Sequence, residues 1–328
     1  MTTSPQRSRP MVSVALATYN GARYLRAFLD SLNAQTMRNI EVIASDDASR
    51  DATVAILNDY NALPVRVIEH ATNQGVLRNF EDAIAGASAD HVFFADQDDF
   101  WEPDKIERMT ARMVALEAKH GRDHPLLVFC DLRIVDADLN ELEASYFRSS
   151  GKAAHAVDTR DYIVSNHVPG CAMVVNRALI ERALPIPAGV YLHDWWFMLV
   201  ATIFGTVEGV AEPLIRYRQH GNNTVGFAGT PGSRLRRLLG YTHKPVERAR
   251  VRIAFYREAS RIVERNVTAL REKYGNTLPA NAQQLLAAVA SPRWRDRLGA
   301  LRGAKTGESR TATLMMTALM WRQDGQRS

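Results

Sequence analysis

The chain has 328 residues, of which 46% are hydrophobic and 23% charged, enough for one large domain and an appendage. Its two cysteines, Cys130 and Cys171, exclude a disulfide framework, and no C-x-x-C pattern indicates zinc. The net charge of +5 divides unevenly: residues 230–328 carry 20 basic and 7 acidic side chains, a net +13, whereas residues 1–229 carry a net −8. We therefore expect an acidic body and a basic C-terminal region that face different partners.

The N-terminal residues 1–10 are polar and basic, without the apolar core of a signal peptide. We expect them to be flexible, and we expect a cytoplasmic protein, in keeping with the few cysteines. The longest apolar stretch, residues 195–207, is too short to span a bilayer and predicts a buried helix.

Strand and helix patterns alternate through the first hundred residues. Apolar runs predict strands at 12–17, 40–45, 65–69 and 91–95. Amphipathic stretches between them predict helices, since the apolar side chains recur at helical spacing. This alternation predicts an α/β fold with a mostly parallel sheet flanked by helices. No glycine-rich phosphate loop is present, so neither a dinucleotide fold nor a P-loop is supported.

Beyond Arg122 the alternation loosens, and the chain ends in a mostly helical pattern. Further strands are predicted at 126–130, 171–175 and 212–217, and a helix from His193. The breaker cluster at 229–232 predicts a boundary between a domain over 11–229 and a basic helical region over 230–328. In that region one helical stripe is basic and the opposite face is apolar. The stripe consists of Arg250, Arg257, Arg261 and Arg265.

An acidic tetrad, Asp96-Gln97-Asp98-Asp99, follows the fourth predicted strand. Three carboxylates in four residues repel one another, and a hard divalent cation such as Mg²⁺ or Mn²⁺ relieves that repulsion. Open α/β sheets bind ligands at this edge. The alternative for the tetrad alone is that Asp98 and Asp99 cap the following helix.

A second acidic segment, containing Asp46 and Asp47, follows the second predicted strand. A carboxylate here could accept the ring N–H of uracil or thymine, and Tyr19 could stack on that base. Taken alone, Ser49 and Asp51 suit capping of the next helix and Tyr19 suits packing. Two acidic loops at one edge of a sheet favour a nucleotide and metal site.

Residues 11–229 resemble the family 2 glycosyltransferases, which are inverting, metal-dependent enzymes with the GT-A fold, a Rossmann-like architecture. The resemblance rests on segments that occur in the family's order and spacing: 12–21, 45–51, 73–76 with Asn79 and Phe80, and 95–101 with Pro103 and Lys105. The Asp-Gln-Asp-Asp-x-Trp form is similar to the rhamnosyltransferase-like subgroup.

The resemblance implies roles for the acidic loops. Asp47 resembles the carboxylate that contacts the pyrimidine, with Tyr19 beside the base and Asp46 nearby. Asp96 resembles the residue facing ribose and phosphate, and Asp98 the direct metal ligand. Helix capping is the expected role of Asp99, and Gln97 only marks the subgroup.

Basic residues are expected around the diphosphate. Segment 216–223 resembles the family's basic segment that closes over the diphosphate, so Arg218 could neutralise phosphate and His220 could add an imidazole ligand to the metal. Arg78 could reach the diphosphate, or it could be a solvated helix residue.

The general base is expected at Asp194, which matches the family's catalytic carboxylate at the start of a helix. The alternative role is an N-cap on the 195–207 helix, and both roles can hold at once. We expect His193 to be a structural neighbour and Trp195 and Trp196 to be core residues rather than sugar platforms.

These features predict a glycosyltransferase that moves a sugar from a nucleotide-diphosphate donor, dTDP-rhamnose or a UDP-sugar, to a glycan or lipid-linked acceptor in bacterial surface polysaccharide assembly. The alternatives are a nucleotidyltransferase and a non-catalytic nucleotide-sugar-binding protein. The basic region could dock on the inner face of the plasma membrane, or fold onto the body or a partner subunit. Nucleic-acid binding is not expected, because no reader motif is present.

Overall fold

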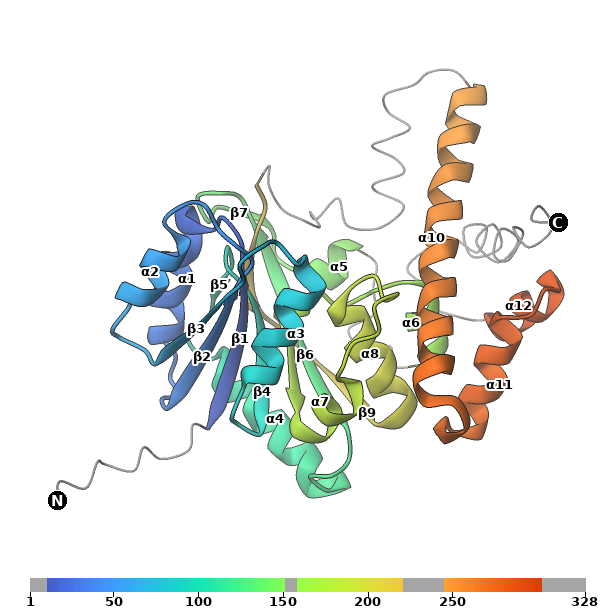
Figure 1. Ribbon diagram of the computed structural model, residues 1–328, viewed down its shortest axis with the longest axis horizontal. Helices are drawn as coiled ribbons and strands as arrows, with labels where there is room; N and C mark the ends of the chain where they lie inside the picture. The colour runs from blue at the N-terminus through green and yellow to red at the C-terminus, as the bar shows by residue number, and fades with distance from the viewer. Residues whose placement is uncertain (1–10, 151–157, 221–244, 303–328) are drawn as a thin grey trace.

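The computed structural model describes residues 11–150, 158–220 and 245–302 (Figure 1). Within these residues nine strands form one sheet, in the order β3-β2-β1-β4-β8-β6-β9-β5, with β7 paired to β6. The strands are β1 (Val12–Thr18), β2 (Ile40–Asp46), β3 (Val65–Glu69), β4 (His91–Asp96), β5 (Phe100–Trp101), β6 (Leu126–Val135), β7 (Glu141–Glu143), β8 (Met173–Asn176) and β9 (Thr206–Arg218).

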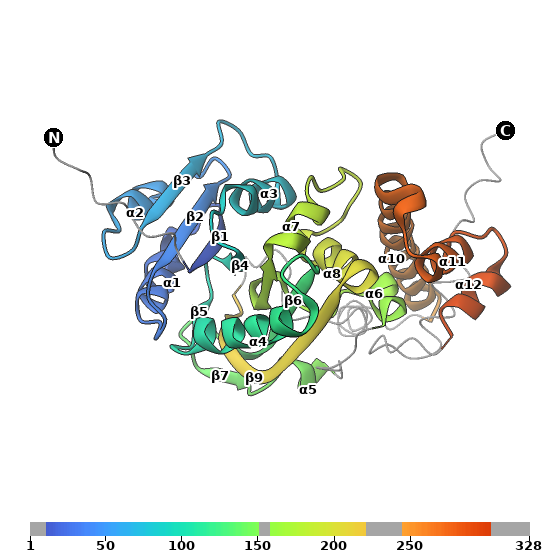
Figure 2. The same ribbon diagram turned by 90° about the horizontal axis from the view of Figure 1, so that it is seen from below.

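Helices cover both faces of this sheet. They are α1 (Ala22–Asn33), α2 (Thr53–Asp59), α3 (Val76–Gly86), α4 (Lys105–His120), α5 (Tyr146–Ser150), α6 (Thr159–Val164), α7 (Arg177–Ala183), α8 (His193–Phe204), α10 (Pro245–Tyr274), α11 (Ala280–Val289) and α12 (Trp294–Ala300). Helices α3, α7 and α8 lie on one face, and α1 and α4 on the other (Figure 2). The α/β architecture predicted from the sequence is confirmed.

Strands β3, β2, β1 and β4 form a wholly parallel half. Along the chain, each of these strands is joined to the following one by a helix, as the alternating pattern predicts. The register pairs Thr18 of β1 with Asp46 of β2, and Ala17 of β1 with Asp96 of β4. Both acidic loops therefore leave the sheet at one edge, on either side of β1.

The other half of the sheet is mixed. Strand β8 is antiparallel to both β4 and β6, whereas β6 and β9 run parallel. The two-residue strand β5 pairs with β9, with Phe100 opposite Arg216 and Trp101 opposite Ile215. This pairing brings the end of the acidic tetrad beside the end of β9. The mostly parallel sheet expected from the sequence thus describes the first half, whereas the second half combines antiparallel pairs with the parallel pair of β6 and β9.

Helix α10 packs on the body, α11 packs on α10, and α12 packs on α11 (Figures 1 and 2). Helix α10 contacts α6, and its inward residues Val263, Val267 and Leu270 are buried. The Tyr274 ring is stacked with Trp196 of α8 at a centroid distance of 6.0 Å. The helical extension is therefore present and shares the core of the α/β domain. The opposite stripe of α10 (Arg250, Arg257, Arg261 and Arg265) is exposed.

Two sequence predictions fall on residues that the structure does not describe. These are the flexible segment 1–10 and the boundary near residue 229. The predicted buried helix over 195–207 corresponds to α8, whose first nine residues are all buried. In the described part of the chain, no helix is both long enough and apolar enough to cross a membrane.

Candidate active site

Asp46 organises the loop after β2. Its carboxylate accepts hydrogen bonds from the Thr18 hydroxyl (2.8 Å), the Ser49 N–H (2.8 Å) and the Ser49 hydroxyl (2.6 Å). These bonds tie the ends of β1 and β2 together. A buried carboxylate that accepts several hydrogen bonds fixes the conformation of the loop.

A cavity of about 440 Å³ opens beside this loop, between the segments that follow β1, β2 and β3. The Tyr19 side chain, 46% exposed, forms one wall. Other lining residues are Asp46, Ser49, Arg50, Glu69, His70 and Asn73. The volume and the polar walls suit a nucleobase with its ribose. Tyr19 and Asp46, which the resemblance put near the base, both line the cavity, and their contact with a nucleoside stays a prediction.

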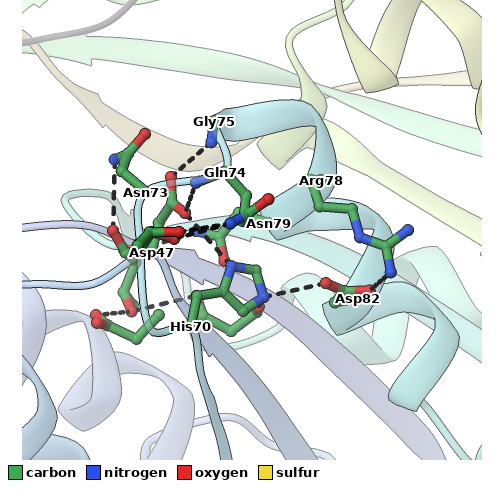
Figure 3. A network of polar contacts seen from close by, with 12 residues as sticks. Asp47, His70, Asn73, Gln74, Gly75, Arg78, Asn79 and Asp82 are labelled. Carbon is green, nitrogen blue, oxygen red and sulfur yellow. Dashed lines mark hydrogen bonds and ion pairs between the residues drawn. The ribbon is translucent and has the colours of Figure 1, made fainter. Parts of the chain in front are cut away.

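Asp47 does not line this cavity. Its two oxygens accept the backbone N–H groups of Gln74 (2.6 Å) and Gly75 (2.9 Å), just before α3 (Figure 3). The His70 ring lies between two carboxylates, 3.4 Å from Asp47 and 3.0 Å from Asp82. Asp47 therefore anchors the β3–α3 connection, and its contact with a pyrimidine stays a prediction.

Arg78 belongs to the outer end of the same network. Its guanidinium pairs with Asp82 at 2.8 Å and Glu81 at 3.4 Å, both on its own helix, and the side chain is 55% exposed (Figure 3). This is the arrangement of a solvated helix arginine. Its contact with a diphosphate stays a prediction.

The two expected metal ligands meet. The Nε2 atom of His220 lies 2.7 Å from an oxygen of Asp98, and the two side chains are 13% and 18% exposed. The His220 ring is stacked on Tyr24 of α1, with 4.8 Å between centroids. Since a carboxylate can only accept, the Nε2 atom donates its proton to Asp98 in this arrangement. With that proton displaced, the carboxylate oxygen and the imidazole nitrogen could both ligate a cation such as Mn²⁺. Tyr24 was not identified from the sequence, because only the fold brings α1 beside the end of β9.

A second acidic group faces inward. Ligand atoms of Asp96, Asp99 and Cys171 lie within 4.8 Å of one another. Burial, followed by the charges of Asp98 and Asp96, raises the pKa of Asp99 well above its usual value. Burial, followed by the charges of Asp98 and Asp194, raises the pKa of Asp96 to about 7. Burial also raises the pKa of the Cys171 thiol. A cation binds the deprotonated forms of these groups, so it would compete with protons at this inward group.

Lys105 supplies the buried positive charge beneath this group. Its Nζ donates to the Cys171 carbonyl at 2.8 Å and lies 3.1 Å from the centre of the Trp101 ring. Burial lowers its pKa to about 8. Sequence reasoning recognised Lys105 only as a matching position, since no pattern marks a lysine as fully buried.

Asp99 does not cap the following helix, so that prediction is wrong. Helix α4 begins at Lys105 with Asp104 at its N-cap, and β5 separates Asp99 from it. The Asp99 side chain is instead buried in the core, where its carboxylate accepts a hydrogen bond from the backbone N–H of Arg218 at 3.4 Å.

Arg218 holds the tetrad from the side of β9. Its Nε donates to the Asp98 carbonyl at 2.8 Å, and a second nitrogen donates to the Ala137 carbonyl. The guanidinium also lies 4.5 Å from the centre of the Tyr24 ring. Arg218 is therefore a buried support for the loop, and its contact with phosphate stays a prediction.

Asp194 lies in the first turn of α8, where its carboxylate accepts the Trp195 N–H at 2.6 Å. The N-cap position itself belongs to Leu192. Asp194 is close enough to Asp96 for its charge to raise the pKa of that residue. The fold thus brings the start of α8 to the acidic tetrad, although the two segments are far apart in the sequence.

The neighbours of Asp194 are structural, as expected. The His193 ring stacks on Phe80 at 3.6 Å, and burial lowers its pKa to about 3. Neither ring nitrogen has a hydrogen-bond partner among the described residues. The indoles of Trp195 and Trp196 donate to carbonyls of the core and are buried.

The profile of a known protein family, described as glycosyl transferase family 2, matches residues 13–181. An uncharacterized protein of Mycobacterium tuberculosis strain H37Rv is 29% identical over 223 residues, which are 64% of this chain and 59% of that protein. The present chain therefore spans less than two thirds of that relative's length. The dTDP-rhamnosyl transferase RfbG of Shigella flexneri is 27% identical over 226 residues, 64% of this chain and 73% of that protein.

Among solved structures, the mannosyltransferase PcManGT from Pyrobaculum calidifontis, in complex with GDP-Man and Mn²⁺, is similar with a TM-score of 0.51. The two chains are 17% identical, and the match covers 97% of this chain and 89% of that one. This likeness supports the GT-A fold that the strand order displays. Since the family profile covers more than half of the chain, the chain belongs to glycosyl transferase family 2.

Proposed function

We propose that this protein is an inverting, metal-dependent glycosyltransferase that moves a sugar from a nucleoside diphosphate to an acceptor hydroxyl. The observation that carries the proposal is the convergence of the Asp98–His220 pair, the half-buried Asp96 and the Asp194 carboxylate beside a polar cavity. Each group has a distinct task in such a transfer, and one edge of the sheet presents all of them.

The chemistry follows from these groups. Asp98 and His220 would hold Mg²⁺ or Mn²⁺, which when bound neutralises charge on the departing diphosphate. Asp194 accepts the proton of the acceptor hydroxyl as that oxygen attacks the anomeric carbon from the opposite side. Tyr19, Asp46 and the cavity hold the nucleoside, so the leaving group is oriented before the bond breaks.

The donor is proposed as dTDP-rhamnose or a UDP-sugar. The similarity to an enzyme described as a dTDP-rhamnosyl transferase supports the first choice. The tetrad ending in Asp98 and Asp99 has the form of that subgroup. The acceptor is proposed as a glycan or a lipid-linked saccharide of a bacterial surface polysaccharide, assembled on the cytoplasmic side.

The exposed stripe of α10 is proposed as the surface that meets an anionic membrane. Residues 245–302 carry 12 basic and 5 acidic side chains, and on a different helix, α12, the 51% exposed Trp294 stands between Arg293 and Arg295 in the sequence. Cationic side chains beside an exposed tryptophan suit a headgroup region. A lipid-linked acceptor would then be concentrated near the site.

A panel of dTDP-, UDP- and GDP-sugars with Mn²⁺ tests the proposal. We expect one donor to raise the unfolding temperature and to be hydrolysed slowly to a nucleoside diphosphate, with the anomeric configuration of the released sugar inverted in the NMR spectrum. Release of pyrophosphate from a nucleoside triphosphate would indicate nucleotidyl transfer instead. Binding without turnover of donor in the presence of acceptor glycans would indicate a non-catalytic binding protein.

A further inference from the structure

We infer that Gln97 is a positioning residue that couples the nucleotide side of the site to its metal side. The inference rests on the proposed function and adds a residue to it. Gln97 stands between Asp96 and Asp98, and sequence reasoning gave it no task. Its side chain leaves the metal loop and reaches the loop after β1.

The contact is a pair of hydrogen bonds to one residue. The Gln97 Nε2 donates to the Tyr19 carbonyl at 2.9 Å, and the Tyr19 N–H donates to the Gln97 Oε1 at 3.0 Å. A side-chain amide thus satisfies both polar groups of a backbone residue, as a neighbouring strand would. We call this pair of bonds the Gln97 clasp. A glutamate could accept one bond but could not donate the other, so the amide itself is required.

The clasp extends the contact between β1 and β4. Backbone pairing of these strands ends at Ala17 and Asp96. Beyond that point the two loops separate, one carrying the Tyr19 wall of the cavity and the other the Asp98 carboxylate. The clasp is therefore a direct bridge from the base side to the metal side.

The absence of a side chain at Gly21 leaves the space that the Gln97 side chain occupies. A Cβ atom there would lie 1.9 Å from the Gln97 Oε1 and 2.2 Å from its Cδ. Its backbone φ of −102° is open to any residue, so the glycine is not needed for the turn. The Gln97 side chain is what excludes a larger residue, and an alanine at position 21 should displace the clasp without removing Gln97.

The steric contact between position 21 and Gln97 can be tested with a double-mutant cycle at these two positions. We expect Gln97→Ala and Gly21→Ala each to lower kcat/KM for the donor by about tenfold to a hundredfold, because a misplaced loop misaligns the diphosphate. In Gln97→Ala the side chain that blocks a methyl group at position 21 is gone. The double variant should therefore be no worse than Gln97→Ala alone, within about threefold. Effects that simply multiply would overturn the clasp.

A second readout separates positioning from stability. We would titrate UDP or dTDP into each variant by calorimetry, with and without Mn²⁺. In the wild type, Mn²⁺ should strengthen nucleotide binding, and Gln97→Ala should reduce that enhancement about tenfold while affinity without metal stays within about threefold. Gln97→Glu should fail to restore it. Gln283→Ala is the matched control, since that amide also donates to a backbone carbonyl (Leu278, 2.8 Å) far from the site.

The outcomes are distinguishable. An unchanged Mn²⁺ enhancement in Gln97→Ala, with only a lower unfolding temperature, would reduce Gln97 to a structural residue and leave the proposed function standing. A wild type that binds neither nucleotide would overturn the proposed function, and the inference would fall with it.

Discussion

The two halves of the sheet hold their functional groups in different ways. In the parallel half, Asp46 and Asp47 are fixed by hydroxyl and amide groups of adjoining loops. In the mixed half, Arg218 and Asp194 are buried, and the Arg218 guanidinium donates to backbone carbonyls of Asp98 and Ala137, which are far from it in the sequence. The site residues of the first half are therefore held by loops next to them in the sheet. The positions of those in the second half depend on contacts between segments that are far apart in the sequence. Substitutions should therefore affect binding on one side and chemistry on the other.

The largest effect is expected where the halves meet. Asp98→Asn should lower metal-dependent turnover by about 10³-fold, because the cation loses a charged ligand opposite the diphosphate. The fold should survive, since Asp98 is partly exposed. Initial rates at saturating Mn²⁺ measure the effect, with the exposed Asp138→Asn as the control. Turnover at the wild-type rate in Asp98→Asn with EDTA present would refute the metal mechanism.

On the packed side, Asp194→Asn should lower kcat for transfer by about 10²-fold or more, because the acceptor hydroxyl loses its base. Donor affinity should stay within about twofold, since Asp194 is assigned to the acceptor. Transfer rates and calorimetric titration of the donor diphosphate together measure this separation. A large loss of donor affinity would make Asp194 a structural residue.

His193 tests how strongly packing governs the second half. Its pKa is lowered to about 3, against about 6.5 when unfolded. Below pH 6.5 the unfolded state binds a proton at this imidazole, whereas the folded state does not. The stability present above pH 6.5 is therefore lost progressively as the pH falls toward 3. At pH 5 the loss is about 2 kcal/mol. His193→Phe should therefore flatten the fall in unfolding free energy between pH 8 and pH 5, measured by urea denaturation.

Subtracting the unfolding free energy at pH 5 from that at pH 8 removes any packing cost of the larger ring that does not depend on pH. Leu142→Phe, which adds the same ring at an exposed position and removes no ionisable group, is the control and should keep the wild-type slope. A wild-type slope in His193→Phe would show that the buried ring is not the group that titrates.

The smallest effect is expected at the surface of α10. Replacing Arg257, Arg261 and Arg265 with glutamine should weaken binding to vesicles containing phosphatidylglycerol by about tenfold. Donor hydrolysis in solution should not change. The matched control replaces three exposed basic residues of the body: Lys119, Arg122 and Arg148. Co-sedimentation equal to the wild type would refute the membrane surface, and equal loss with neutral phosphatidylcholine would point to a protein contact.

The sequence was most informative where structure is local. Alternating strands and helices predict that Asp46 and Asp96 share an edge, and the β1 register confirms it. The antiparallel direction of β8 was not predictable, because a buried apolar strand looks the same in either direction. The two-residue strand β5 leaves no periodic signal, and this is why Asp99 was misassigned as a helix cap.

The contact between Asp98 and His220 could not be predicted from local sequence patterns. Their contact joins residues 122 apart and depends on β5 pairing with β9. Family resemblance predicted both residues, whereas spacing alone did not. Residues that only support the site, such as Lys105 and Gln97, became visible through burial and hydrogen bonding, which sequence patterns do not record.

The stacking of Tyr274 on Trp196 has a consequence for any attempt to divide the protein. Trp196 belongs to the helix that begins with His193 and Asp194, and the Tyr274 hydroxyl also donates to the Arg182 carbonyl at 2.8 Å. A protease that removed the chain beyond residue 229 would leave that tryptophan without its cover. Helix α10 thus covers part of the helix that carries Asp194, and we expect a fragment that ends at residue 229 to be less stable than the full chain.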